Sequence, residues 1–194
     1  MHPVTRTIAP FLLMLPVAVG CSRKRPAPAA VTPVEQTVGD DSARRDSLAR
    51  AEAARRDSLA RAAALREARE RRLADARATL ASPVYFAYDR ADLSSEARGK
   101  LEAKGPILNA SPELRVRLEG HTDERGSDEY NLALSHRRAA SARQFLIALG
   151  VPETRLDVAS FGEERPVCTE STEACWSRNR RVEFDIVAGV VVVQ

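Results

Sequence analysis

Between residues 82 and 188 the chain switches between two hydrophobic patterns, one typical of strands and one typical of helices. The aromatic stretch VYFAY, which begins at Val84, and the stretches LRVRLEG, RLDVASFG and RRVEFDIVAG predict four strands. In the last of these, Val182, Phe184 and Ile186 alternate with charged residues. This pattern indicates a sheet that is buried on one face and solvated on the other.

Two stretches between these strands have helical spacing. Ser94 or Ser95 can cap the first helix, and the Gly-Pro pair that follows Lys104 is expected to kink it. Ser127 caps the second helix and Gly150 ends it; its expected apolar face is Leu132, Ala139, Ala142, Leu146 and Leu149. The order β-α-β-α-β-β predicts an α+β two-layer sandwich, with two helices on a four-stranded mixed sheet.

Residues 41–81 precede this domain and have no Gly or Pro, a composition that predicts one long helix. The octapeptide ARRDSLAR begins at Ala43 and again at Ala54, and the leucine stripe is thin. This favours a solvated single helix held by acid–base pairs, about 60 Å long, over the alternative of a weak coiled coil. Residues 21–40, rich in Pro and Ala, predict a flexible tether.

Residues 1–20 read as a secretory signal, because the apolar run from Ile8 to Gly20 is too short to span a bilayer. The sequence AVGC resembles a lipoprotein processing site, with Ala18 where Leu is usual. Cys21 would then be lipidated, and Ser22 after it points to the outer membrane, on its periplasmic face. An ordinary secreted protein is the alternative.

The number of cysteines and the distribution of charge indicate how the cysteines pair and which class of ligand is excluded. With Cys21 lipidated, Cys168 and Cys175 remain as an even pair, and a disulfide is favoured over a metal site. Residues 22–81 carry 14 Lys and Arg against 9 Asp and Glu, whereas residues 82–194 carry 15 against 18. The domain is therefore mildly acidic, which argues against nucleic acid as its ligand.

The motifs VYFAYD, LEGHTDERGSDEYNLALSHRRA, FGEERPV and NRRVEF, spread over residues 83–187, resemble the OmpA-like C-terminal domain family. Within that family they are most similar to the peptidoglycan-associated lipoproteins (Pal). The resemblance implies non-covalent binding of peptidoglycan through meso-diaminopimelate, a tether between outer membrane and cell wall, and a role in envelope integrity and cell division. It also implies a TolB-like periplasmic partner, no cofactor and no catalysis.

The resemblance assigns the key acid to Asp123 and the key base to Arg138. A carboxylate beside a guanidinium matches the ammonium and carboxylate of diaminopimelate. Supporting positions carried over from the family pattern are Thr122 and Asn131, which would hold the loop, Gly126, which permits the turn, and Phe86 and Leu134, which would line the pocket. Ala87 stands where the family often has Asp. Arg180 and Arg181 either approach the polymer or brace the sheet.

Three other interpretations remain. His121, Asp123 and His136 could form a metal or hydrolytic cluster, although no known catalytic motif accompanies them. A flagellar stator protein shares the domain but needs an uncleaved transmembrane helix, and an adaptor would use the long helix to bind a protein. The apolar tail, residues 189–194, is expected to extend the last strand or a neighbouring edge.

Overall fold

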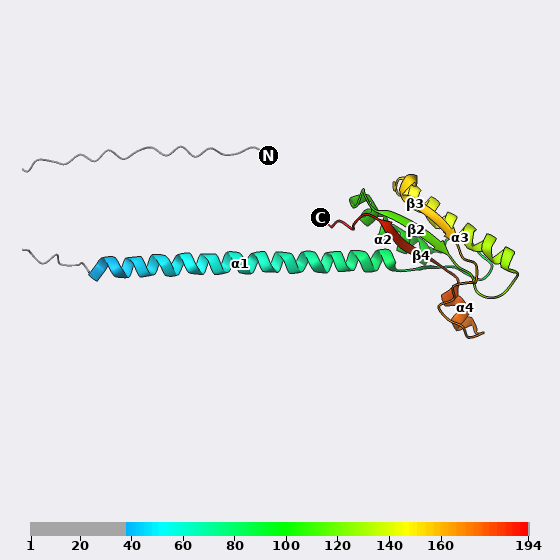
Figure 1. The fold of residues 1–194 in the computed structure, drawn as a ribbon, viewed down its shortest axis with the longest axis horizontal. Coiled ribbons are helices and arrows are strands. Elements are labelled where there is room, and N and C mark those ends of the chain that lie inside the picture. Colours follow the sequence, from blue (N-terminus) through cyan, green and yellow to red (C-terminus); the bar gives the residue numbers. More distant parts are fainter. Residues whose placement is uncertain (1–37, 194) are drawn as a thin grey trace, which may run out of the picture. The chain divides into compact units, whose positions relative to one another are not determined.

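The structure, a computed structural model, describes residues 38–193 of the 194-residue chain (Figure 1). The predicted signal, the lipidation site Cys21 and residues 22–37 of the tether lie outside the described residues. The elements, in chain order, are α1 (Val38–Ala81), β1 (Val84–Tyr85), α2 (Ser95–Ala110), β2 (Arg115–Gly120), α3 (Asp128–Ala148), a 3-10 turn (Glu153–Arg155), β3 (Leu156–Ser160), α4 (Glu173–Asn179) and β4 (Arg181–Ala188).

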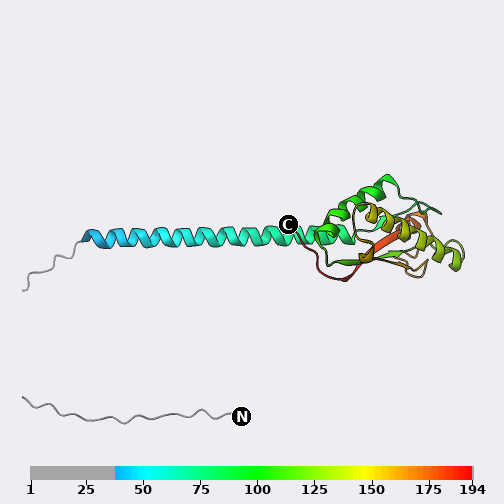
Figure 2. The same cartoon turned by 90° about the horizontal axis from the view of Figure 1, so that it is seen from above.

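The four strands form one mixed sheet in the order β1-β4-β2-β3. Strand β4 pairs antiparallel with both β1 and β2, and β2 pairs parallel with β3. Helices α2 and α3 lie together over one face of this sheet (Figure 2). The predicted two-layer sandwich is confirmed, with α4 as an addition that sequence reasoning missed.

Both predicted helix starts are present. The Ser94 side chain accepts a hydrogen bond from the backbone N–H of Ala97, and that of Ser127 accepts one from Tyr130. Helix α2 continues through Pro106 to Ala110, so the Gly-Pro pair does not end it. Gly105, directly before the proline, packs closely against the side chain of Leu149. Burial of this part of α2 against the end of α3 therefore offsets the hydrogen bond that proline cannot make.

The buried face of α3 differs from the prediction in its first half. Leu132 is 39% exposed, whereas Asn131, Ser135 and Arg138 are buried. The apolar core begins only at Ala139 and continues through Ala142 and Leu146, as predicted. The first two turns of α3 face a loop and a cavity rather than the core, so polar Asn131 is buried there beside Leu134.

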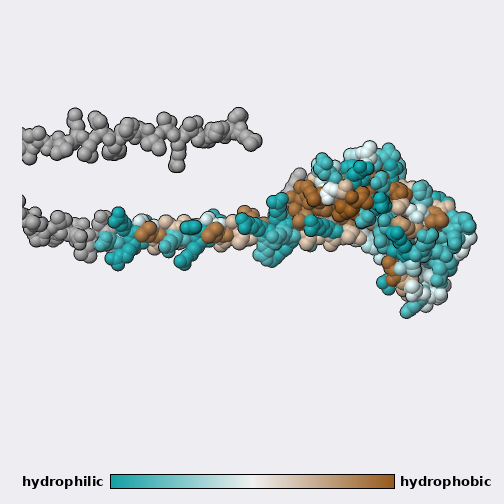
Figure 3. Space-filling view, viewed as in Figure 1, coloured by the Kyte–Doolittle hydropathy of each residue, from teal (hydrophilic) through white to brown (hydrophobic). Residues whose placement is uncertain are grey.

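The last turns of α1 belong to the domain core. Ala76 and Leu80 are buried in the same cluster as the apolar residues of the sheet, and Leu73 packs against it. Upstream, Leu48, Leu59 and Leu65 are exposed. The surface of this helix is mostly polar, with separate apolar spots along it (Figure 3). Ion pairs at i,i+4 spacing, such as Arg61 with Asp57 and Arg71 with Glu67, stabilise this solvated part.

Within residues 38–193, no helix is both long and apolar enough to cross a membrane.

The C-terminal tail does not extend the sheet as expected. Strand β4 ends at Ala188, and Gly189 then takes a positive φ of 84° at a point where a Cβ would meet the carbonyl oxygen of Glu113. The Val192 N–H then donates to Ser111 Oγ at 2.8 Å, and Val191 is buried in the core. Apolar surface gathers where β4 ends and the tail begins (Figure 3).

Candidate functional site

A cavity of about 140 Å³ opens at the end of the sheet where β2 runs into α3. Its walls come from the β1–α2 loop, the β2–α3 loop, the first turns of α3 and the residue before β4. The lining residues are Tyr88, Asp89, Thr122, Asp123, Arg125, Gly126, Tyr130, Asn131, Leu134, Arg138 and Arg180. Six of the seven residues assigned to binding from the sequence therefore surround one cavity.

Asp123 is a buried carboxylate held by two guanidinium groups. Its Oδ2 accepts hydrogen bonds from Arg125 Nη2 at 2.7 Å and from Arg180 Nη1 at 3.0 Å, and its Oδ1 accepts from the Arg125 backbone and side chain. Burial would raise the pKa of Asp123, but these hydrogen bonds outweigh it and hold the pKa below its ordinary value. The group is therefore an anion at neutral pH.

Arg138 is fully buried and bonds to backbone rather than to an acid. Its Nε, Nη1 and Nη2 donate to the carbonyl oxygens of Arg90, His121 and Ala87 at 2.8, 3.0 and 3.0 Å. Burial lowers its pKa to about 10, and the nearby charge of Asp123 opposes that shift. Arg138 therefore keeps its charge at neutral pH. A guanidinium has five N–H donors, so one on each Nη remains for a ligand.

The supporting residues divide into two groups. Asn131 Nδ2 donates to the Arg125 carbonyl and to Glu163, so it holds the loop, and Gly126 turns the loop with a φ of 118°. The hydroxyl of Thr122 does not hold the loop as expected. It is buried with no partner among the described residues, and it lines the cavity. A buried hydroxyl without a partner is costly, so Thr122 Oγ1 is available to a ligand.

Phe86 lies outside the cavity lining. Its ring is buried 5.5 Å from the guanidinium carbon of Arg138, so it contacts the key base rather than the open space. Asp89, two residues beyond Ala87, does line the cavity and accepts a hydrogen bond from the Tyr130 hydroxyl. Strand β1 ends at Tyr85, shorter than VYFAY predicted, and Tyr88 and Asp89 form a turn in which Asp89 has a positive φ of 54°. Sequence reasoning missed this carboxylate because it considered only position 87.

The disulfide between Cys168 and Cys175 is present, and the loop it closes leads into α4. Helix α4 contacts two of the arginines that line the cavity. Glu173 pairs with Arg180, and the Trp176 ring lies 4.1 Å from the guanidinium of Arg125. The two arginines of the NRR motif have different places. Arg180 lines the cavity, where a ligand could approach it. Arg181 braces the sheet, because it pairs with Glu183 and donates to backbone carbonyls.

The predicted alternative cluster of His121, Asp123 and His136 does not form. His136 is exposed on α3, and Asp123 is bonded to the two arginines. The His121 ring is buried, and burial lowers its pKa to about 4. The acids whose carboxylates approach this ring are Glu119 and Glu183.

The chain is similar to known proteins in both sequence and fold. The sequence profile of the OmpA family matches residues 85–180. The peptidoglycan-associated lipoprotein of Pseudomonas putida is 39% identical over 177 residues, which cover 91% of this chain and 93% of that protein. The protein of the same name from Pseudomonas aeruginosa is 46% identical over 113 residues, 58% of this chain and 67% of that protein.

Among solved structures, the crystal structure of the peptidoglycan-associated lipoprotein from Burkholderia pseudomallei is similar to this fold. It superposes with a TM-score of 0.54 and 36% sequence identity, over 56% of this chain and 92% of that chain.

Proposed function

Since the chain belongs to the family of the peptidoglycan-associated lipoproteins and carries an OmpA domain, we propose that it is an outer-membrane lipoprotein that binds peptidoglycan non-covalently. The observation that carries this proposal is the cavity in which a buried anion, Asp123, and a buried cation, Arg138, lie at one opening. Groups of opposite charge in one small cavity suit a zwitterionic ligand better than an anion or a cation alone.

The ligand is the free end of meso-diaminopimelate in the stem peptide, which presents an ammonium and a carboxylate on one carbon. The ligand carboxylate takes the two remaining N–H groups of Arg138, and Thr122 Oγ1 supplies a further hydrogen bond. Hydrogen bonds to charged groups are worth about 1.5–3 kcal/mol each. Three or four of them, after the losses on association, support a modest affinity for one stem peptide.

The ligand ammonium competes with Arg125 for Asp123. Arg125 is 29% exposed and lies between the rings of Tyr88 and Trp176, at 4.0 and 4.1 Å. Arg180, in contrast, is buried and also bonds to the Phe86 carbonyl. Arg125 is therefore the group that yields its place on the carboxylate, whereas Arg180 stays.

The segments before the domain complete the proposed tether. Cys21 carries the lipid in the outer membrane, residues 22–40 and α1 span part of the distance to the wall, and the domain binds the polymer. A tether raises the effective concentration of many stem peptides, which offsets a modest affinity at each one. A TolB-like periplasmic partner and a role in envelope integrity during cell division belong to this proposal.

The test is sedimentation of the purified protein with isolated sacculi. Asp123→Ala and Arg138→Ala should each reduce the sedimented fraction to background, and free meso-diaminopimelate should displace the wild type. Asp128→Ala and Arg137→Ala are matched controls, because they remove the same side chains from exposed positions nearby. Circular dichroism must accompany Arg138→Ala, since that change leaves three carbonyl groups without their donor.

Two outcomes contradict the proposal. Sedimentation of folded Asp123→Ala at the wild-type level would remove the site assignment. Release of soluble fragments from sacculi by the wild type would indicate an enzyme instead of a binding protein. The anchor has its own test, because Cys21→Ser should move the protein from the outer-membrane fraction to the soluble periplasm.

A further inference from the structure

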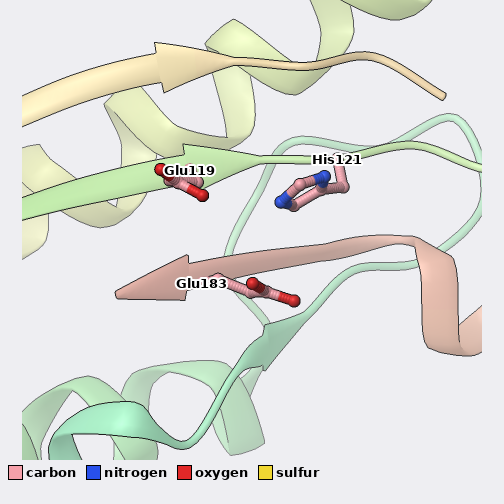
Figure 4. A group of neighbouring side chains, drawn as sticks. All are labelled: Glu119, His121 and Glu183. Atoms are coloured by element: carbon pink, nitrogen blue, oxygen red, sulfur yellow. The ribbon is translucent and has the colours of Figure 1, made fainter. Parts of the chain in front are cut away.

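His121 lies in a second polar cluster, on the side of the β2–β4 pair opposite the helices. Glu119 on β2 and Glu183 on β4 are direct cross-strand partners, so their side chains share a face of the sheet. His121, two residues beyond Glu119, directs its ring toward the same place (Figure 4). One carboxylate oxygen from each acid and one ring nitrogen all lie within 4.8 Å of one another.

Within residues 38–193, the imidazole of His121 has no hydrogen-bond partner. The residue is 1% exposed, and both Nδ1 and Nε2 are buried without a partner among the described residues. Its backbone is satisfied, because the N–H donates to the Arg181 carbonyl and the carbonyl accepts from Arg138. A neutral imidazole is one donor and one acceptor, and leaving both of them buried and unpaired destabilises the fold.

The two carboxylates also face each other across the strands, where like charges are destabilising. Two arginines offset this repulsion. Arg181, which is buried, bonds to Glu183, and Arg165 approaches Glu119 at 3.8 Å. The second pair is loose, and the Arg165 side chain is 59% exposed over the ring of Phe161. Arg165 is therefore free to move aside, which opens Glu119 to another cation.

We propose that Glu119, His121 and Glu183 form a binding site for a divalent first-row transition-metal ion, with Zn²⁺ as the representative case. Imidazole and carboxylate are established Zn²⁺ ligands, at about 2.0–2.2 Å from the ion. Tetrahedral coordination at those lengths puts ligand atoms about 3.4 Å apart, so the side chains need to close by little more than an ångström. Three protein ligands leave a fourth position for water.

The ring nitrogen distinguishes this site from an acidic patch. Carboxylates and water alone suit Mg²⁺, whereas an imidazole favours Zn²⁺ and its neighbours in the first row. The ion replaces Arg165 on Glu119 and gives the His121 ring the partner that it lacks. The sequence alone did not predict the site, because Glu183 is distant from His121 along the chain and only the β2–β4 register brings them together.

The test is calorimetric titration of the purified full chain with Zn²⁺ alone. The wild type should bind one ion at this site, and Glu119→Gln and Glu183→Gln should each weaken that binding at least tenfold. The controls are His136→Gln and Glu164→Gln, which remove an exposed imidazole and an exposed carboxylate elsewhere and should leave the affinity unchanged. Glutamine keeps the shape of glutamate, so both test variants should fold.

A second measurement distinguishes the contribution of the His121 imidazole to Zn²⁺ binding from that of the two carboxylates. Mg²⁺ in excess should not displace Zn²⁺, and the ring signals of His121 should shift on addition of Zn²⁺ in both control variants. Absence of saturable Zn²⁺ binding, equal affinities in the test and control variants, or displacement by Mg²⁺ would each overturn the proposal.

Discussion

Two basic side chains, Lys104 and Arg138, are fully buried in this domain, and each donates to three backbone carbonyls. Lys104 Nζ bonds to the carbonyls of Thr79, Leu80 and Ser82 and to the Ser82 hydroxyl. It thereby satisfies carbonyl groups at the C-terminal end of α1, where helices favour cations. Arg138 joins the β1–α2 loop to the end of β2.

Lys104 and Arg138 differ in the number of N–H donors that are left for a ligand after these hydrogen bonds. An ammonium has three N–H groups, and the four oxygen atoms around Lys104 use all of them. A guanidinium has five, and Arg138 keeps two of them at the wall of a cavity. Burial of a charge is thus no sign of function by itself, because only the base with spare donors beside an opening can take a ligand.

The largest effect expected from this difference is on stability, at Lys104. Lys104→Ala should lower the free energy of unfolding by about 3 kcal/mol, because it leaves carbonyls of α1 unpaired in a buried place. Urea unfolding followed through Trp176, the single tryptophan, measures the change. Lys100→Ala, one turn earlier on α2 and partly exposed, should cost less than about 1 kcal/mol. Equal losses in the two variants would mean that the buried contacts of Lys104 contribute nothing special.

Arg138→Lys should affect binding more than stability. A lysine retains the charge and can reach some of the carbonyls, but it cannot supply two parallel N–H groups to a carboxylate. Binding to sacculi should fall at least tenfold, which corresponds to about 1.4 kcal/mol. Arg137→Lys, on the exposed side of the same helix turn, should bind like the wild type. A co-sedimentation isotherm measures both variants, and full binding by Arg138→Lys would show that charge alone suffices.

The smallest expected effect is on the acid dependence of stability. The pKa of Asp123 is lowered in the folded state, so the unfolded chain binds its proton more readily. The stability that Asp123 contributes is therefore complete above its ordinary pKa of 3.8 and is lost as the pH falls below it. In Asp123→Asn, the free energy of unfolding should therefore fall less between pH 5 and pH 3 than in the wild type, by an amount on the order of 1 kcal/mol. Unchanged pH dependence of urea unfolding in this variant would contradict the shift.

The sequence allowed the layered fold to be predicted because its signals are local. Ser94 and Ser127 cap their helices, Gly150 ends α3, and the alternation of Val182 with Phe184 fixes a buried face. Family resemblance then located Asp123 and Arg138, which line one cavity in the structure. Their binding role remains a prediction until it is measured.

Features that depend on distant contacts could not be read from the chain. Leu132 fits a helical stripe, yet it is exposed because the cavity takes the place of the core at that turn. Lys104 is a charged residue within α2, and its burial depends on the docking of α1 against it, which no local pattern predicts. The short helix α4 was missed because its seven residues carry little pattern, although Thr172 caps it.

The docking of Leu80 and Lys104 also bears on mechanics. If the chain is pulled from its N-terminal side, the tension reaches the sheet through packed side chains and not through a loose peptide hinge. Detachment of α1 would require Leu80 to leave the core and Lys104 to release all its acceptors at once. Resistance to pulling would therefore begin at this joint, before any strand of the sheet separates.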